Sequence, residues 1–162
     1  MPRLLPCASL CLGVLATLAV LVGFSRPALA SAYGLSDIDL VDEAMAGRMA
    51  AMQIQTTLDL FNATKTPKGV AAVSKKLKVS AAKVQDWRDF CDLLRIDGIG
   101  PKLARVLSLC GIKRLSLLSA AQPAALADRI KEVNASAEIL GKLPGEENVR
   151  SWIEQAKKLG SR

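Results

Sequence analysis

The chain has 162 residues, with 22 Lys and Arg, 15 Asp and Glu, and no histidine. The lack of histidine excludes His-dependent catalytic triads, imidazole general bases and zinc sites with histidine ligands. A formal charge of +7 is compatible with an anionic partner, and the length suits one compact domain or two small repeats.

Residues 1–30 have the pattern of a secretory signal peptide. Arg3 precedes an uncharged run over residues 7–25, and Ala28-Leu29-Ala30 forms a small-residue exit. We therefore expect cleavage after Ala30, which would remove two arginines and no acid and lower the formal charge from +7 to +5. The alternative is an uncleaved membrane anchor, because the run is nearly long enough to span a bilayer.

Export would place the mature chain in the bacterial periplasm or outside the cell, or in a thylakoid lumen if the source is photosynthetic. Contact with a membrane is then expected only through the signal segment. Two cysteines remain after cleavage, Cys91 and Cys110. An oxidising compartment permits a disulfide, but both lie on apolar helical faces, where cysteine commonly serves as a small hydrophobe. The sequence favours free thiols and leaves their pairing open.

The mature chain has the periodicity of helices throughout. Val70, Val73 and Leu77 recur at helical spacing, and no segment alternates with period two long enough to form a strand. The predicted fold class is therefore all-α. The expected helices are 67–79, a helix capped by Ser80 and ending at Leu93-Leu94, one from Pro101 to Cys110, 123–133, and a last helix from the loop at 141–145 to Gly160.

The most distinctive motif is the turn Ile96-Asp97-Gly98-Ile99-Gly100, which is followed by Pro101 and a new helix. Two glycines one residue apart allow positive φ, and Pro101 suits the first position of a helix. Backbone amides around Gly98, Gly100 and Lys102 would point outward at the helix N-terminus, where an anion is favoured. Lys102 and Arg105, one helical turn apart, would stand on the same side.

This pattern resembles the helix-hairpin-helix motif, hydrophobic-Gly-hydrophobic-Gly-x-x-x-Ala, with Ala104 in the last position. The resemblance implies binding to DNA phosphates without reading the base sequence. Asp97 departs from the proline often found there, and we expect it to hold the turn by an Asx-type bond. The competing interpretation is a turn that only packs two helices. The positions that match the phosphate-contacting hairpin are Gly98, Ile99, Gly100, Lys102 and Arg105.

Residues 31–94 and 95–162 are predicted to be two tandem helix-hairpin-helix-like repeats packed as one pseudo-symmetric helical domain. Landmarks recur between them, which argues for duplication of one supersecondary unit. The landmarks are Ile38–Ala46 with Ile96–Ala104, Ile54 with Ile112, Leu58–Phe61 with Leu115–Leu118 after a one-residue slip, and Val84-x-x-Trp87 with Val149-x-x-Trp152.

The first hairpin is degenerate, because Leu40 and Asp42 replace Gly98 and Gly100. Residues 31–64 also carry five acidic residues against one basic residue, so we expect this surface to repel phosphate. The chain resembles an uncharacterised bacterial family of tandem helix-hairpin-helix-related domains. Members of this family have a degenerate first half, a Gly-Ile-Gly-Pro second half and a Trp-bearing helix in each half. In this chain the domain follows the expected signal peptide.

The sequence does not predict an enzyme. Gly98-x-Gly100 is too short for a Walker-type phosphate loop, and two cysteines cannot hold a zinc ion alone. The carboxylates are scattered, so no metal, cofactor or small-molecule substrate is expected. Basic residues concentrate over 65–83 and 102–114, and the favoured interpretation of such runs is a solvated helix face. The alternative is that both clusters flank the second hairpin and extend a track for phosphates.

Two functions are compatible with these features. The first is an exported, non-enzymatic module that binds the backbone of duplex DNA weakly and without sequence preference. The second is a protein-interaction or scaffold module that keeps the hairpin for its shape and binds an exported protein partner, as related hairpins do in an exported extrinsic subunit of photosynthetic bacteria. Export favours the second function, because free DNA is an uncommon ligand outside the cytoplasm. The intact second hairpin with its basic residues favours the first function, which is the one we expect.

Overall fold

The computed structural model describes residues 32–38 and 41–160, so the expected signal peptide and Leu40 lie outside the described residues. Within this part the chain forms eight α-helices and one short 3-10 helix, with no strand, which confirms the all-α fold class. In chain order they are η1 (Leu35–Asp37), α1 (Glu43–Ala50), α2 (Thr57–Ala63), α3 (Pro67–Leu77), α4 (Ala81–Leu93), α5 (Pro101–Leu109), α6 (Leu115–Ser119), α7 (Pro123–Ala137) and α8 (Glu146–Gly160).

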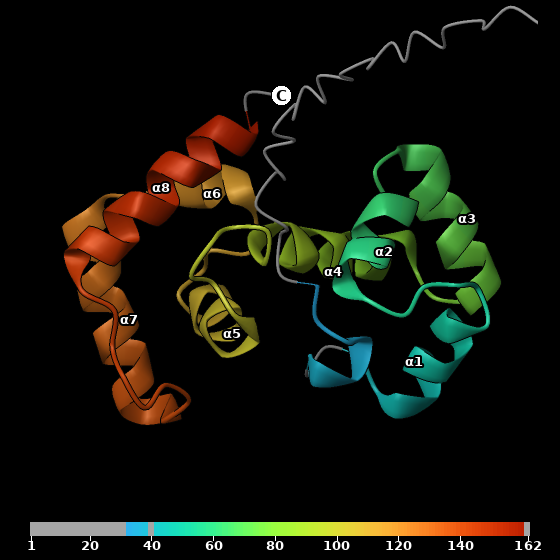
Figure 1. Cartoon of the computed structure of the whole chain (residues 1–162), viewed down its shortest axis with the longest axis horizontal. Helices are drawn as coiled ribbons and strands as arrows, with labels where there is room; N and C mark the ends of the chain where they lie inside the picture. The colour runs from blue at the N-terminus through green and yellow to red at the C-terminus, as the bar shows by residue number, and fades with distance from the viewer. Residues whose placement is uncertain (1–31, 39–40, 161–162) are drawn as a thin grey trace, which may run out of the picture.

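The helices form two groups, with α1–α4 on one side of the molecule and α5–α8 on the other (Figure 1). α2 and α3 pack on α4, and in the same way α6 and α7 pack on α8. α1 packs on α3 and α5 packs on α7, while α4 also contacts α6. Buried apolar side chains from every α-helix belong to one continuous cluster, so the two groups share a single core.

The ends of the helices follow local sequence signals. Ser80 caps α4 by accepting a hydrogen bond from the Lys83 amide at 3.2 Å, as expected. α7 is longer than the expected 123–133, because Asn134 stabilises its end. The Asn134 side chain accepts hydrogen bonds from the amides of Ile139 (3.1 Å) and Leu140 (2.7 Å), which allows the helix to continue to Ala137.

The same backbone geometry occurs at matching places in the two groups. Ile54 N donates to Met49 O at 3.0 Å, and Ile112 N donates to Leu107 O at 2.8 Å. The residues just before the two donors, Gln53 and Gly111, both have positive φ, at 61° and 90°.

The expected one-residue slip is absent from this correspondence. Leu60 N donates to Thr56 O and Leu118 N donates to Arg114 O, and these two acceptors are the N-caps of α2 and α6. Leu60 and Leu118 therefore occupy the same position relative to the N-caps of α2 and α6. Each leucine is completely buried.

Candidate functional site: the glycine hairpin between α4 and α5

The hairpin is a tight turn anchored by two buried isoleucines. Ile96 and Ile99 are 1% and 2% exposed, and Ile99 N donates to Ile96 O at 3.1 Å. Gly98 occupies the third position of this four-residue turn with φ +88°, the conformation that a type II turn requires at that position. The predicted positive φ is therefore confirmed at Gly98, and the isoleucines hold the turn on the core.

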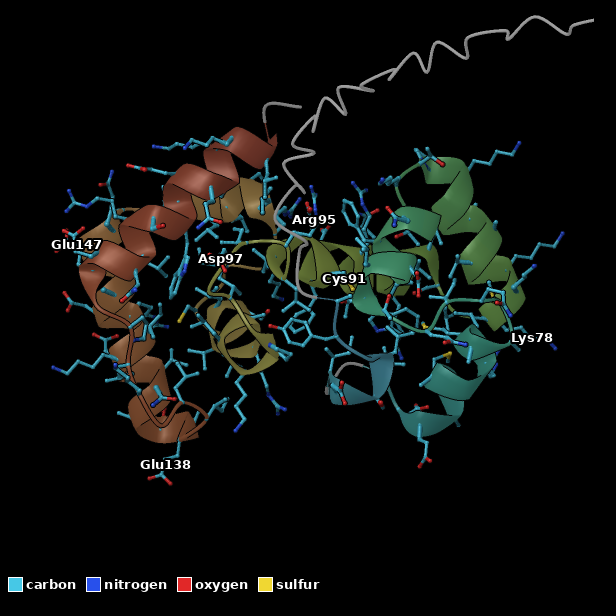
Figure 2. All side chains as sticks on the ribbon, viewed as in Figure 1. Lys78, Cys91, Arg95, Asp97, Glu138 and Glu147 are labelled. Carbon is cyan, nitrogen blue, oxygen red and sulfur yellow. The ribbon has the colours of Figure 1, made fainter. Side chains whose placement is uncertain are left out.

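Gln155 of α8 fixes the other side of the turn. Its side-chain oxygen accepts a hydrogen bond from Asp97 N at 2.9 Å, and its side-chain nitrogen donates to Asp97 O at 3.4 Å. Figure 2 labels Asp97 at this turn, beside α8. The hydrogen bonds recorded for Asp97 in the described chain use its backbone, so the expected Asx-type bond is not what holds the turn. The sequence did not identify Gln155 as a partner.

Gly100 is the N-cap of α5 and makes no side-chain cap. Its φ is −93°, so the turn does not use at Gly100 the positive φ that a glycine allows. As the N-cap of α5, Gly100 has an extended backbone. Its carbonyl accepts a hydrogen bond from Ala104 N at 2.9 Å. In the described part of the chain, the amides of Gly98, Gly100 and Lys102 donate no recorded hydrogen bond. Such amides at a helix N-terminus favour an anion.

The five predicted site residues all lie on this turn or the first half of α5. Lys102 and Arg105 are exposed on α5, Gly98 is exposed and Gly100 is half-buried. The side chain of Ile99 is buried, so only its backbone can face a ligand. The structure therefore brings the five residues together, and the donors among them include backbone amides and the Lys102 ammonium.

Tyr33 also reaches this site, which the sequence did not predict. Thr57 N donates to Tyr33 O at 2.9 Å, and Tyr33 N donates to the Thr57 hydroxyl at 3.2 Å, so the segment before η1 is tied to α2. The Tyr33 hydroxyl then lies 3.5 Å from the position that a Cβ on Gly100 would occupy.

The first half has a different arrangement at the matching position. Asp42 is the N-cap of α1, and its carboxylate accepts a hydrogen bond from Met45 N at 2.7 Å. A negative charge therefore already lies at the N-terminus of α1. The N-terminus of α5, by contrast, has no side-chain cap, because its N-cap residue is Gly100.

The lysine-rich segment over 65–83 does not flank the hairpin, and its exposed lysines agree with the favoured interpretation of a solvated helix face. Its central helix, α3, packs on α1, α2 and α4. Figure 1 shows α3 at the edge of the molecule opposite α7, and Figure 2 labels Lys78 there, far from Asp97. The apolar stripe of Val70, Val73 and Leu77 sets this position, because it packs into the core of the first group and turns the lysines outward.

The cysteines and acidic residues in the described part of the chain form no disulfide and no metal site. Cys91 is buried and Cys110 half-buried, and both are free thiols. No group of three or more His, Cys, Asp or Glu side chains in the described ranges could hold a metal ion. None of the helices in the same ranges is long and apolar enough to cross a membrane.

The fold and the hairpin define a class of protein: an all-α domain with a glycine turn at a helix N-terminus. Residues 40–159 match the model of the family described as "Domain of unknown function (DUF4332)", and the chain belongs to this family. The expected membership of an uncharacterised domain family is thus confirmed. No curated protein and no solved structure matches the chain.

Proposed function

We propose that this protein binds the phosphate backbone of duplex DNA through the N-terminus of α5, weakly and without sequence preference. The observation that carries the proposal is the cluster of amides at Gly98, Gly100 and Lys102 without recorded partners, next to the exposed Lys102 side chain. An exposed lysine adds charge to a helix N-terminus that already favours an anion. The relationship to helix-hairpin-helix domains is part of this proposal.

We also infer that the two halves arose by duplication and that the mature chain is exported. Duplication is supported by the matching hydrogen bonds of Ile54 and Ile112 and by the buried Trp87 and Trp152 in the last helix of each half. Export is supported by the sequence of residues 1–30. Mass spectrometry of protein made in a bacterial host should find a chain that begins at Ser31, whereas an intact chain in the membrane fraction would contradict cleavage.

Titration with labelled duplex DNA at several salt concentrations tests the DNA proposal. Two to four phosphate contacts should give a slope of log affinity against log salt near −2 to −4, with dissociation constants of about 10⁻⁴ to 10⁻⁶ M. Lys102→Ala should weaken binding to all sequences and flatten the slope by about one unit. Lys76→Ala on α3 removes the same charge far from the hairpin and should leave the slope nearly unchanged.

Gly100→Asp gives a sharper test, because it copies Asp42 of the first half. An aspartate is a good N-cap, so the variant should stay folded and gain a few tenths of a kcal/mol. Its carboxylate would cover the same amides and repel phosphate, so DNA binding should be lost. If wild-type protein shows no salt-dependent binding at low ionic strength, or if Gly100→Asp binds as well, the proposal is wrong. The hairpin would then serve as a packing element in a protein-interaction module.

A further inference from the structure

The solvent side of α3 is a uniformly basic surface that the proposed hairpin site does not use. Residues 65–83 contain six lysines and no acidic residue. Lys68 and Lys75 are two helical turns apart on the side of α3 opposite its buried apolar stripe. Lys76 lies beside them and Lys78 ends the helix, and all four lysines are exposed. We call Lys68, Lys75, Lys76 and Lys78 the lysine face.

The charges of the lysine face are not cancelled by ion pairs within the described part of the chain. None of the ion pairs recorded there uses any of its four lysines. Arg48 of α1 adds a further positive charge, because its guanidinium donates a hydrogen bond to Leu77 O at the end of α3. Asp42, Asp59 and Asp92, on helices that pack on α3, have partners of their own. The lysine face therefore keeps its positive charge.

The corresponding helix of the second group has a different charge pattern. α7 packs on α5 and α8 as α3 packs on α1 and α4. Both helices end at a residue with a left-handed backbone, which is Lys78 at φ 56° in α3 and Glu138 at φ 50° in α7. A helix in this place therefore does not need a row of lysines in order to fold. The exposed charged residues within α7 have both signs: Asp128, Arg129, Lys131 and Glu132.

The composition of the lysine face fits a partner with diffuse negative charge. All the basic residues of 65–83 are lysines. Lysine is a point charge on a flexible stem, whereas arginine forms the bidentate pairs typical of fixed phosphate sites. Between Lys68 and Lys75 the exposed residues are Ala71 and Ala72, whose side chains cannot form hydrogen bonds. The face therefore responds to charge density and has no groups that would read the shape or the bases of a nucleic acid.

We propose that the lysine face docks this protein on the surface of an anionic phospholipid bilayer. α3 lies at the edge of the molecule (Figure 1), and Figure 2 labels Lys78 at the same edge, so the helix can lie along a flat surface. None of the exposed large apolar side chains of the described chain belongs to α3, so the contact stays at the lipid headgroups. This contact would be additional to the expected signal segment. It does not depend on DNA binding, because it uses no residue of the hairpin.

Sedimentation with vesicles tests the proposal on the chain as isolated from a bacterial host. One set of vesicles contains phosphatidylcholine alone, and the other contains equal parts of phosphatidylcholine and phosphatidylglycerol. The ratio of the two partition coefficients measures the electrostatic contribution, because any uncharged contact of residues 1–30 is common to both sets. The protein should prefer the anionic vesicles, and 1 M salt should abolish the preference by reducing the screening length to about 3 Å.

Paired substitutions locate the contact. Each lysine near an anionic surface contributes about fivefold to binding, so Lys68→Ala with Lys75→Ala should reduce the preference about 25-fold. Alanine suits exposed helix positions, so this variant should stay folded, which circular dichroism checks. Lys68→Arg with Lys75→Arg keeps both charges and should bind like wild type. Lys131→Ala with Lys142→Ala removes the same charge from exposed positions in the second group and is the matched control.

Several results would overturn the proposal. One is equal partitioning of wild-type protein into both sets of vesicles. Another is an equal loss in the two alanine pairs, which would mean that only net charge matters. Loss of binding in the arginine pair would also contradict it. If Lys68→Ala with Lys75→Ala weakens binding to duplex DNA and leaves the vesicle preference unchanged, the lysine face binds nucleic acid and the proposal is wrong.

Discussion

The Nε1 atom of Trp152 lies 2.9 Å from the point where a Cβ on Gly98 would stand. No real Cβ fits at that distance without movement of the indole, and Trp152 is buried in the core, so the ring cannot easily move. Gly98 therefore satisfies two requirements together, a positive φ and close contact with α8. This contact connects the turn between α4 and α5 to the last helix of the chain.

Gly98→Ala should destabilise the fold by about 2–4 kcal/mol. The left-handed conformation costs about 1–2 kcal/mol for a residue with a Cβ, and the contact with Trp152 adds an overpacking cost. Gly111→Ala is the matched control, because Gly111 has φ +90° with nothing near its Cβ position. Urea unfolding of the two variants separates the conformational cost from the steric cost. Equal losses in both would show that the Trp152 contact carries no cost.

Gly100→Ala should cost less than about 1 kcal/mol, the scale of an unfavourable N-cap residue. Its φ of −93° suits any residue, and its Cβ would make an ordinary 3.5 Å contact with the Tyr33 hydroxyl. Thermal unfolding followed by circular dichroism checks this value. A loss as large as that of Gly98→Ala would mean that the turn requires two glycines for its backbone.

Gln155→Ala should destabilise the protein by about 1 kcal/mol and speed hydrogen exchange at the Asp97 amide. The substitution removes both hydrogen bonds to the Asp97 backbone, but water can replace them because Asp97 is exposed. Glu154→Ala, at an exposed neighbouring position of α8, serves as the control and should leave the Asp97 amide protected. Unchanged exchange in Gln155→Ala would contradict the role of this side chain in holding the turn.

Cys91 should make the fold less stable at alkaline pH. Burial, reinforced by the charge of Asp92, raises the pKa of the Cys91 thiol from 9.0 to about 12. Between pH 9 and 12 the unfolded chain loses this proton while the folded chain keeps it. Stability is therefore complete below pH 9 and falls as the pH rises, by up to about 1.4 kcal/mol per pH unit.

Urea unfolding at several pH values from 8 to 11 measures this slope. Cys91→Ala should show a shallower fall than wild type above pH 9, although its stability at neutral pH is lower because of the lost packing. Parallel curves for the two proteins would show that the Cys91 thiol has the same pKa in the folded and unfolded chains, which would contradict the prediction.

The sequence by itself determined the all-α class, the longer helices α3, α4, α5, α7 and α8, and the hairpin. Apolar spacing placed Val70, Val73 and Leu77 on one face, and Ser80 and Pro101 marked the starts of α4 and α5. The positive φ of Gly98 was also predictable. These features depend on residues a few positions apart, whose backbone geometry follows from their own chemistry.

Only the tertiary structure decided which distant groups meet the hairpin. The pairing of Gln155 with Asp97 joins residues far apart in the chain, and so does the contact of Trp152 with Gly98. The position of α3 away from the hairpin was decided in the same way, by how its apolar stripe packs. Spacing along the chain shows that a side chain will be buried, but the packing of whole helices selects the residue against which it is buried.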